Sequence, residues 1–353
     1  MTSRLKSGLL LLGVAVVLAP GTISAGSYKW VDEKGNVTYS DRPPQSADSP
    51  ATAPAEVVPL NLKNLEVVKP APPVQEQDYK KYLPPAVVPR SGPTRVDDLL
   101  ELTGVRAHLV GLARGIAKEL RPAPGIMNAK DQASIDRVLA KSLRPEALYG
   151  LMREAFIPQI DRTNLEATAA WLRSPLGRRI TMLEVATVDP SFEQKVADYN
   201  EEIKANRLSD RRVELIWRLD WVMGSSDSSA DLYATLSRGV TKAVSAAGPP
   251  ERRLRPGQID EQVAEIRARV SKPLSAVHHE ATRYAYRDLS DDELTAYVVF
   301  ASSDAGRWYH NAMHKAMISA VGRTVEQTAV ELVRAVPVER WARAAQPAPQ
   351  AVR

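Results

Sequence analysis

From Thr94 onward, apolar residues recur at intervals of three and four positions, which is the spacing of one face of an α-helix. Asp97 and Asp98 begin this pattern, where acidic side chains favour a helix N-terminus. The spacing predicts helices over 96–120, 130–142, 145–157, 162–173, 175–186, 190–206, 209–223, 228–246, 257–270, 272–287, 290–302 and 304–335. Pro- and Gly-rich breaks interrupt the pattern at 121–125 and 247–257. We therefore expect a mainly α body.

A different pattern, with a period of two, precedes this body at residues 28–44. Such alternation on both sides of the string DEKGN predicts a β-hairpin, with Pro43 and Pro44 ending the pairing. Gly35 suits the left-handed position of the loop, and Asp32 can accept hydrogen bonds from its amides. We expect Tyr28, Trp30 and Tyr39 to share one face. The residues of the motif are Tyr28, Trp30, Asp32, Gly35, Tyr39, Ser40 and Asp41.

This motif, Tyr-x-Trp-x-Asp-x-x-Gly-x-x-x-Tyr-Ser-Asp, resembles an uncharacterised domain at the mature N-terminus of many proteobacterial envelope proteins. The resemblance covers about 17 residues and implies a location, since the family has no settled activity to carry over. The aromatic positions Tyr28, Trp30 and Tyr39 are candidates for binding a glycan or a partner protein. The alternative is a small aromatic core, which a two-stranded hairpin needs for stability.

The first 25 residues have the three-part layout of a secretory signal peptide. Arg4 and Lys6 precede an apolar run from Gly8 to Ala19, and small residues around Ala25 offer a cleavage site. The run of 12 residues is shorter than the roughly 17–25 that a membrane-spanning helix needs, so cleavage is favoured over retention as an anchor. With no second long apolar run, we expect no transmembrane segment after removal of the signal.

The stretch between hairpin and helices is rich in proline and aperiodic, with twelve of the 26 prolines within residues 42–95. Such a composition is typical of a semi-extended linker. The predicted organisation is a signal peptide, a hairpin domain, a linker, two helical modules and a disordered tail, at residues 1–25, 26–44, 45–94, 95–207, 208–336 and 337–353, respectively.

The two modules are proposed from a repeated string, WLRSPLGRRI at 171–180 and FASSDAGRWY at 300–309. A shift of 129 positions lays Trp171, Ser174 and Gly177 over their counterparts Phe300, Ser303 and Gly306. Other identities, such as Leu165 with Leu294, keep the same order and phase. We interpret this as a duplicated helical module with a longer first segment in the second copy.

Helix capping and packing are sufficient to explain the repeated string, without a catalytic role for its residues. Ser174 and Ser303 would each cap the following helix, and Ser290 with Glu293 forms a possible capping box for the helix before. Gly177 and Gly306 would let another helix approach closely. Trp171 and Phe300 would fill the angle between two consecutive helices, which we call an elbow. A nucleophilic serine needs a paired base, and neither string contains one.

The second copy, LSDDELTAYVVFASSDAGRWY, resembles another uncharacterised helical domain of exported bacterial proteins. In that family an acidic run leads to an aromatic residue and then to Ser-x-x-Gly. The first copy lacks the acidic cluster, which weakens the case for a ligand site shared by both copies. The function of that family is open as well.

The composition of the chain restricts the classes of function that are possible but does not indicate an activity. The chain has 353 residues, 44% of them hydrophobic and 25% charged, which is enough to bury a core. The formal net charge is +5, and basic and acidic residues are mixed along the chain, so no nucleic-acid partner is implied. The absence of cysteine fits export and excludes a disulfide framework.

Two histidines, His310 and His314, are four positions apart, the spacing of metal ligands on one helical face. Asn311 stands where a metalloprotease would have its glutamate, and a methionine-rich stripe shares the face. Of His278 and His279 at most one could add a third ligand, since adjacent residues point about 100° apart. Half-buried structural histidines are the alternative, and we expect no metal and no cofactor.

Clustered acidic residues raise the possibility of carboxylate-based hydrolysis. Asp291, Asp292 and Glu293 form one cluster and Glu201 and Glu202 another, each where a solvated helix start or surface would place it. Nothing in the sequence indicates a carboxylate forced into an apolar pocket, which acid catalysis with a raised pKa requires. The basic pairs at 211–212 and 252–253 are expected to be solvated.

We therefore expect a periplasmic or secreted, non-enzymatic protein. It would bind an unknown envelope protein or cell-wall polymer through the hairpin or through the groove between the helical modules. The alternative is a metal-dependent or carboxylate-based hydrolase in the helical cleft. The surroundings of the histidines and carboxylates discriminate between the two.

Overall fold

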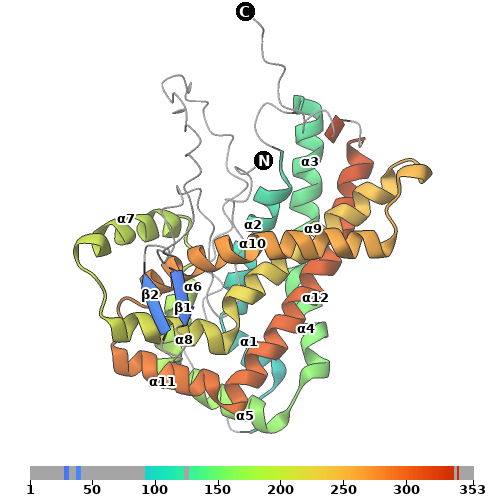
Figure 1. Ribbon diagram of the computed structural model, residues 1–353. Helices are drawn as coiled ribbons and strands as arrows, with labels where there is room; N and C mark the ends of the chain where they lie inside the picture. Colours follow the sequence, from blue (N-terminus) through green and yellow to red (C-terminus); the bar gives the residue numbers. More distant parts are fainter. Residues whose placement is uncertain (1–27, 32–36, 41–91, 123–126, 338–339, 342–353) are drawn as a thin grey trace, which may run out of the picture. The chain divides into compact units, whose positions relative to one another are not determined.

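The computed structural model describes residues 28–31, 37–40, 92–122, 127–337 and 340–341. They fall into two units, one with the two strands and one with the helices, and each is treated on its own below (Figure 1).

Strand β1 (Tyr28–Val31) pairs antiparallel with β2 (Val37–Ser40). The register sets Lys29 opposite Tyr39 and Trp30 opposite Thr38. The expectation that Tyr28, Trp30 and Tyr39 share one face stays a prediction. Asp32, Gly35 and Asp41 lie outside the described residues.

The helical unit has twelve α-helices in the part of the chain that the structure describes. They are α1 (Val96–Leu102), α2 (Val105–Leu120), α3 (Ala129–Ser142), α4 (Pro145–Phe156), α5 (Arg162–Arg173), α6 (Pro175–Ala186), α7 (Phe192–Ala205), α8 (Asp210–Met223), α9 (Ser225–Ala247), α10 (Pro256–Ala285), α11 (Asp291–Ser302) and α12 (Asp304–Ala335). Short 3₁₀ turns, η2 (Ile157–Gln159) and η3 (Pro250–Arg252), follow α4 and α9. The mainly α body expected from the sequence is thus found.

Two boundaries differ from the helices that the periodicity predicts. The stretch 96–120 is divided between α1 and α2 at Gly104, whose φ of 66° lies in the left-handed region. Conversely, α10 continues through Pro273, where the sequence analysis places a break between 270 and 272. Proline removes one helical hydrogen bond, but Val270 and Leu274 beside it are buried, and their packing holds the helix continuous.

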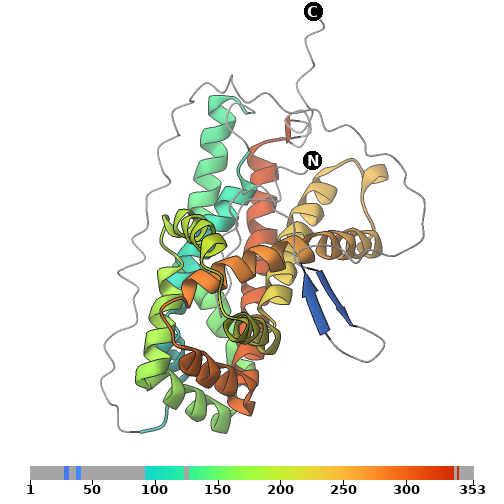
Figure 2. The ribbon, with the colours of Figure 1, turned by 60° about the vertical axis from the view of Figure 1, so that its left-hand side comes forward.

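Helix α12 is the central helix of the unit, with α4 on one side and α9 on the other (Figures 1 and 2). It also packs against α3 and α5, and the buried apolar residues of these helices, α1 and α2 form one large core with it. A second core joins residues of α6, α7, α8, α10 and α11. Trp171 is half-buried and packs against both cores.

Residues of both expected modules contribute to each core. The large core takes Leu109 and Leu148 from residues 95–207 and Leu232 and Val321 from residues 208–336. The second core likewise joins Ile180 to residues of α8, α10 and α11. The position between residues 207 and 208 therefore does not separate two independent cores.

The repeated strings form two helical elbows with the same construction. Ser174 is the N-cap of α6 and its Oγ accepts a hydrogen bond from the Gly177 amide at 3.0 Å. Ser303 caps α12 in the same way, accepting from the Gly306 amide at 3.1 Å. Both serines thus have the role expected from the sequence. The two elbows face each other, because the rings of Trp171 and Phe300 are stacked with their centroids 4.6 Å apart.

The glycines of the elbows let another helix approach closely, as expected from the sequence. A Cβ atom on Gly177 would lie 2.1 Å from the carbonyl oxygen of Trp171, and one on Gly306 would lie 2.1 Å from that of Phe300. The neighbour that excludes a side chain is therefore the preceding helix of the same elbow. A close approach also occurs at Gly239 of α9, where a Cβ would lie 2.8 Å from Cγ1 of Val325 in α12.

We expect Gly306→Ala to lower the free energy of unfolding by about 1–3 kcal/mol, the usual cost of overpacking. The backbone of the elbow must move to admit the methyl group, since a carbonyl oxygen blocks it. Gly150→Ala on α4 is the matched control: no atom lies within 4 Å of its added Cβ, and alanine favours a helix over glycine by about 1 kcal/mol. Urea unfolding of both variants measures the difference. Equal stabilisation by both substitutions would show that the elbow does not require glycine.

Candidate functional site

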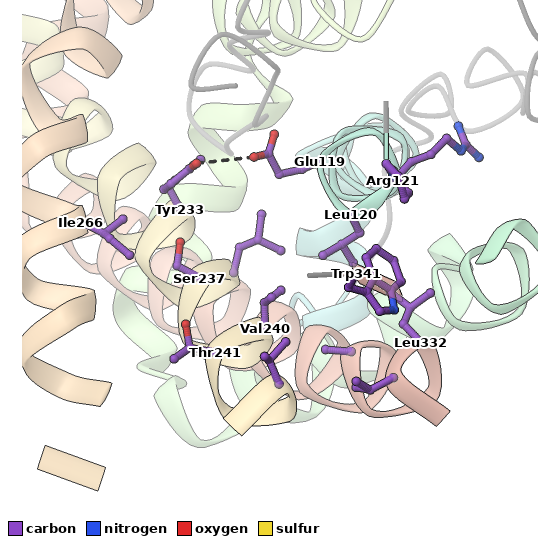
Figure 3. A pocket seen from close by; sticks show the side chains of 15 residues that line it. Glu119, Leu120, Arg121, Tyr233, Ser237, Val240, Thr241, Ile266, Leu332 and Trp341 are labelled. Carbon is purple, nitrogen blue, oxygen red and sulfur yellow. Dashed lines mark hydrogen bonds between the residues drawn. The ribbon is translucent and has the colours of Figure 1, made fainter. Parts of the chain in front are cut away.

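A cavity of about 360 Å³ lies between the C-terminal end of α2, helix α9 and the C-terminal part of α12 (Figure 3). Ile266 of α10 and Trp341 complete its lining. Small-molecule sites commonly measure roughly 300–1,000 Å³ and have mostly apolar walls with few polar groups. The cavity falls at the lower end of that range.

The apolar part of the wall comes mainly from two helices. On α9, Leu236, Val240 and Val244 follow one another at intervals of four residues and so form a row along the helix. Leu332 and Val333 of α12 also line the cavity. Val244 is 43% exposed, which places it where the cavity meets solvent.

A second row on α9 carries hydroxyl groups into the same cavity. Tyr233, Ser237 and Thr241 are also four residues apart and lie beside the aliphatic row (Figure 3). In the described part of the chain, no hydrogen bond is found for the hydroxyls of Ser237 and Thr241, although both residues are partly buried. By contrast, Thr235 on the same helix donates to the Asp231 carbonyl at 2.8 Å, the usual arrangement of a helical threonine.

Tyr233 and Glu119 form the polar end of the cavity. The tyrosine hydroxyl donates to Oε1 of Glu119 at 3.4 Å, the bond drawn in Figure 3. Burial, followed by the charge and hydrogen bond of Glu119, raises the pKa of Tyr233 to about 12. Tyr233 therefore stays protonated at neutral pH and acts as a donor.

Two further side chains that line the cavity are held in place by hydrogen bonds. Nε of Arg121 donates to Oδ1 of Asp136 at 2.9 Å, which joins the end of α2 to α3. The indole of Trp341 donates to the Val336 carbonyl at 3.0 Å. Arg121 supplies the positive charge of the described lining, and this charge is directed at Asp136.

Sequence reasoning did not single out any residue of this cavity. The two rows on α9 are visible in the sequence as hydroxyl and aliphatic residues at intervals of four, but such a stripe is also typical of ordinary helix packing. What makes the site is the meeting of α2, α9 and α12, whose lining residues lie more than 80 positions apart. Periodicity does not reveal that meeting.

A buried carboxyl group, Glu184 of α6, lies at the elbows. It accepts hydrogen bonds at Oε1 from the hydroxyls of Tyr286 and Tyr297, each at 2.8 Å. Burial raises the pKa of Glu184 to about 7, and the two hydrogen bonds act in the opposite direction. The sequence does not indicate this buried carboxyl group, because the partners of Glu184 come from segments more than 100 residues away.

A space of about 10 Å³ adjoins Glu184 and is also lined by Tyr309 and His310. Nε2 of His310 is buried and has no hydrogen-bond partner among the described residues. Burial lowers the pKa of His310 to about 4, so the ring is neutral at pH 7. The space has the size of one water molecule.

His310 and His314 do not converge on a common point. His310 lines the small space beside Glu184, whereas Nε2 of His314 lies 3.3 Å from Oδ2 of Asp231 in α9. Asp231 also accepts a hydrogen bond from Nε of Arg267 at 2.5 Å. Within the described residues, no group of three or more histidine and acidic side chains is placed to hold a metal ion.

His278 and His279 both contact one carboxylate, that of Asp220 in α8. Nε2 of His279 donates to Oδ2 at 3.0 Å, and Nε2 of His278 lies 3.3 Å from Oδ1. Ser226 adds hydrogen bonds from its amide at 2.9 Å and its hydroxyl at 2.8 Å. The Ser226 hydroxyl thus points to the acid, not to an imidazole base, and the cluster joins α8, α9 and α10.

The acidic run at the start of α11 is engaged in ion pairs between helices. Asp291 binds Arg212 at 2.9 Å, and Glu293 binds Arg179 at 2.5 Å while capping α11 with Ser290. The expected capping box is present. Arg212 is largely buried by these contacts, so the expectation of a solvated basic pair at 211–212 is wrong for this residue.

Comparison with known proteins covers only the N-terminal part of the chain. A family model described as a domain of unknown function, DUF4124, matches residues 14–77. The resemblance of the N-terminal motif to an uncharacterised domain is thereby confirmed. No curated protein and no solved structure matches the chain. Among the described helices, none has the length and apolar character that crossing a membrane requires.

Proposed function

We propose that this chain is an exported, non-enzymatic binding protein of the cell envelope, and that the cavity between α2, α9 and α12 takes the apolar chain of a small molecule. The observation that carries the proposal is a cavity of about 360 Å³ with two aliphatic helix faces in its wall. It lies where residues 95–207 meet residues 208–336, the region in which the sequence analysis expects a contact groove. Export is supported by the layout of residues 1–25 and by the absence of cysteine.

A small molecule suits this cavity better than the surface of a folded partner. Protein interfaces of standard size bury about 800 Å² on each side, whereas this cavity is a partly open hollow lined by 15 of the described residues. An apolar chain gains about 0.8 kcal/mol for each methylene group that it buries. A chain of several methylenes therefore suffices for measurable binding after the cost of association.

The alternative of a hydrolase has weaker support from the geometry. His310 and His314 have separate surroundings, and the carboxylates of α11 are held by arginines. Glu184 has the raised pKa of an acid catalyst, but the space beside it is that of one water molecule. The large cavity contains Glu119 with Tyr233, and no histidine is in its described lining.

The proposal is tested with N-phenyl-1-naphthylamine, an uncharged apolar probe whose fluorescence rises on binding. We expect the wild-type protein to bind it saturably and Val244→Trp to weaken binding at least tenfold, because the indole fills the mouth of the cavity. Val244 is already 43% exposed, so the change should leave the fold intact.

Val299→Trp on α11 is the matched control, since Val299 is 65% exposed and lies outside the cavity. Its affinity for the probe should equal that of the wild type, and circular dichroism checks that both variants are folded. Failure of the wild type to bind the probe, or equal binding by the folded Val244→Trp variant, would overturn the proposed function.

A further inference from the structure

The chemistry of the cavity wall indicates which kind of ligand it takes. We infer that the ligand is an uncharged amphiphile, an apolar chain whose polar end carries hydroxyl groups, as in a monoacylglycerol. This inference rests on the proposed function of the cavity. Three features of the wall support it: two hydroxyls that have no hydrogen-bond partner among the described residues, a donor–acceptor pair at one end, and an arginine directed away to α3.

The hydroxyls of Ser237 and Thr241 are the first feature. They face the cavity from one side of α9, and within the described residues neither makes a hydrogen bond (Figure 3). Four residues of helix separate them, which corresponds to about 6 Å along the axis. A hydroxyl can both donate and accept, and partly buried hydroxyls are stabilised by a ligand group that does the same. A polyol head meets this requirement at more than one point.

The pair of Tyr233 and Glu119 continues the hydroxyl row by one helical turn. The tyrosine hydroxyl donates a hydrogen bond to Oε1 of Glu119, and the phenol oxygen can still accept a hydrogen bond from a ligand. A hydroxyl on the ligand can donate to that oxygen or to the carboxylate. A carboxylate on the ligand would have no proton to donate there and would bring a second negative charge near Glu119.

The arginine of the lining also disfavours an anionic head. Arg121 supplies the cationic side chain in the described lining, and its Nε is already hydrogen-bonded to Asp136 at 2.9 Å. Asp136 thus partly balances the positive charge of this guanidinium, which weakens its attraction for an anion in the cavity. The aliphatic row of Leu236, Val240 and Val244 runs alongside the hydroxyl row, so one face of the ligand can be apolar while its edge is polar.

The test is displacement of N-phenyl-1-naphthylamine from the full chain by three ligands with the same twelve-carbon chain, each below its micelle-forming concentration. They are 1-lauroylglycerol, laurate and dodecylamine. We expect 1-lauroylglycerol to displace the probe at a concentration at least tenfold lower than laurate or dodecylamine. Equal displacement by all three, or stronger displacement by either charged ligand, would overturn the inference and leave the proposed function standing.

A variant with Ser237→Ala and Thr241→Val removes both hydroxyls at little change in volume. It should lose affinity for 1-lauroylglycerol at least tenfold and bind N-phenyl-1-naphthylamine as the wild type does. Thr295→Val is the control, since that hydroxyl is bonded to Asp291 on α11, away from the cavity. Unchanged affinity of the double variant for 1-lauroylglycerol would contradict the inference. Absence of probe binding by the wild type would overturn both the inference and the proposed function.

Discussion

Replacing Asp220 by alanine is expected to lower the free energy of unfolding by about 3–5 kcal/mol, the range found when one partner of a buried charged group is removed. The carboxylate accepts hydrogen bonds from His279 and, twice, from Ser226, and His278 lies 3.3 Å away. Without Asp220, these donors stay buried and lose their acceptor. Chemical denaturation at pH 7 measures the loss.

The pKa values around Asp220 agree with this role. Burial would raise the pKa of Asp220, but the hydrogen bond from His279, the charges of the two histidines and the Ser226 hydroxyl together lower it. Burial lowers the pKa of His278 to about 4, so the ring of His278 is neutral at pH 7. The carboxylate is thus ionised and supplied with donors, and it connects α8 to α9 and α10.

Glu214→Ala is the matched control for Asp220→Ala. Glu214 is an exposed acid on the same helix, and its removal should change the free energy of unfolding by no more than about 0.5 kcal/mol. Asp220→Asn retains the shape of the side chain and one acceptor oxygen. Its loss in the free energy of unfolding should therefore lie between those of Glu214→Ala and Asp220→Ala. A loss below about 1 kcal/mol for Asp220→Ala would mean that water or movement of α8 satisfies the donors, and the cluster would not be a structural joint.

The helices and the elbows could be predicted from the sequence because their causes are local. The three- and four-residue spacing of apolar positions gives the helices, and the serine side chains at 174 and 303 reach amides three residues ahead. The repeated Ser-x-x-Gly also indicated the two glycines at which another helix approaches closely. The excluded volume at Gly306 belongs to a carbonyl six residues earlier, which the sequence does not show.

The sites could not be predicted because their residues meet only in the folded chain. Glu184 is one acid among many until Tyr286 and Tyr297, more than 100 residues away, donate to it. The sequence allows one of His278 and His279 as a third metal ligand, whereas in the structure both contact Asp220 on another helix. The continuous α10 has the same origin, since Val270 and Leu274 beside Pro273 are buried together with Ala230 of α9.

Glu184 provides a second large effect, which depends on pH. Its pKa in the folded chain is about 7, compared with 4.5 for an ordinary glutamate, a difference that corresponds to about 3 kcal/mol. Because the folded-state pKa is the higher one, the protonated side chain favours folding. Its contribution is complete below pH 4.5, decreases as the pH rises toward 7, and is lost above that value.

Glu184→Gln should remove this dependence, since the amide is neutral at every pH and its oxygen can still accept from both tyrosines. We expect the variant to match the wild type at pH 5 and to exceed it by up to about 3 kcal/mol in the free energy of unfolding at pH 8.5. Urea unfolding across this range measures the difference between the two proteins. Glu202→Gln, an exposed position on α7, is the control and should show no such divergence.

The difference in unfolding free energy between the wild type and Glu184→Gln reports on Glu184 and not on the other groups that titrate. Burial lowers the pKa of His108 and His278 to about 4, so the stability that these neutral rings contribute is complete above pH 6.5 and is lost as the pH falls toward 4. That loss is common to the wild type and the variant and cancels in their difference. His310, beside Glu184, is likewise neutral from pH 5 to 8.5. If the two proteins keep a constant difference over this range, Glu184 ionises without cost, which requires that water reaches the carboxylate between the elbows.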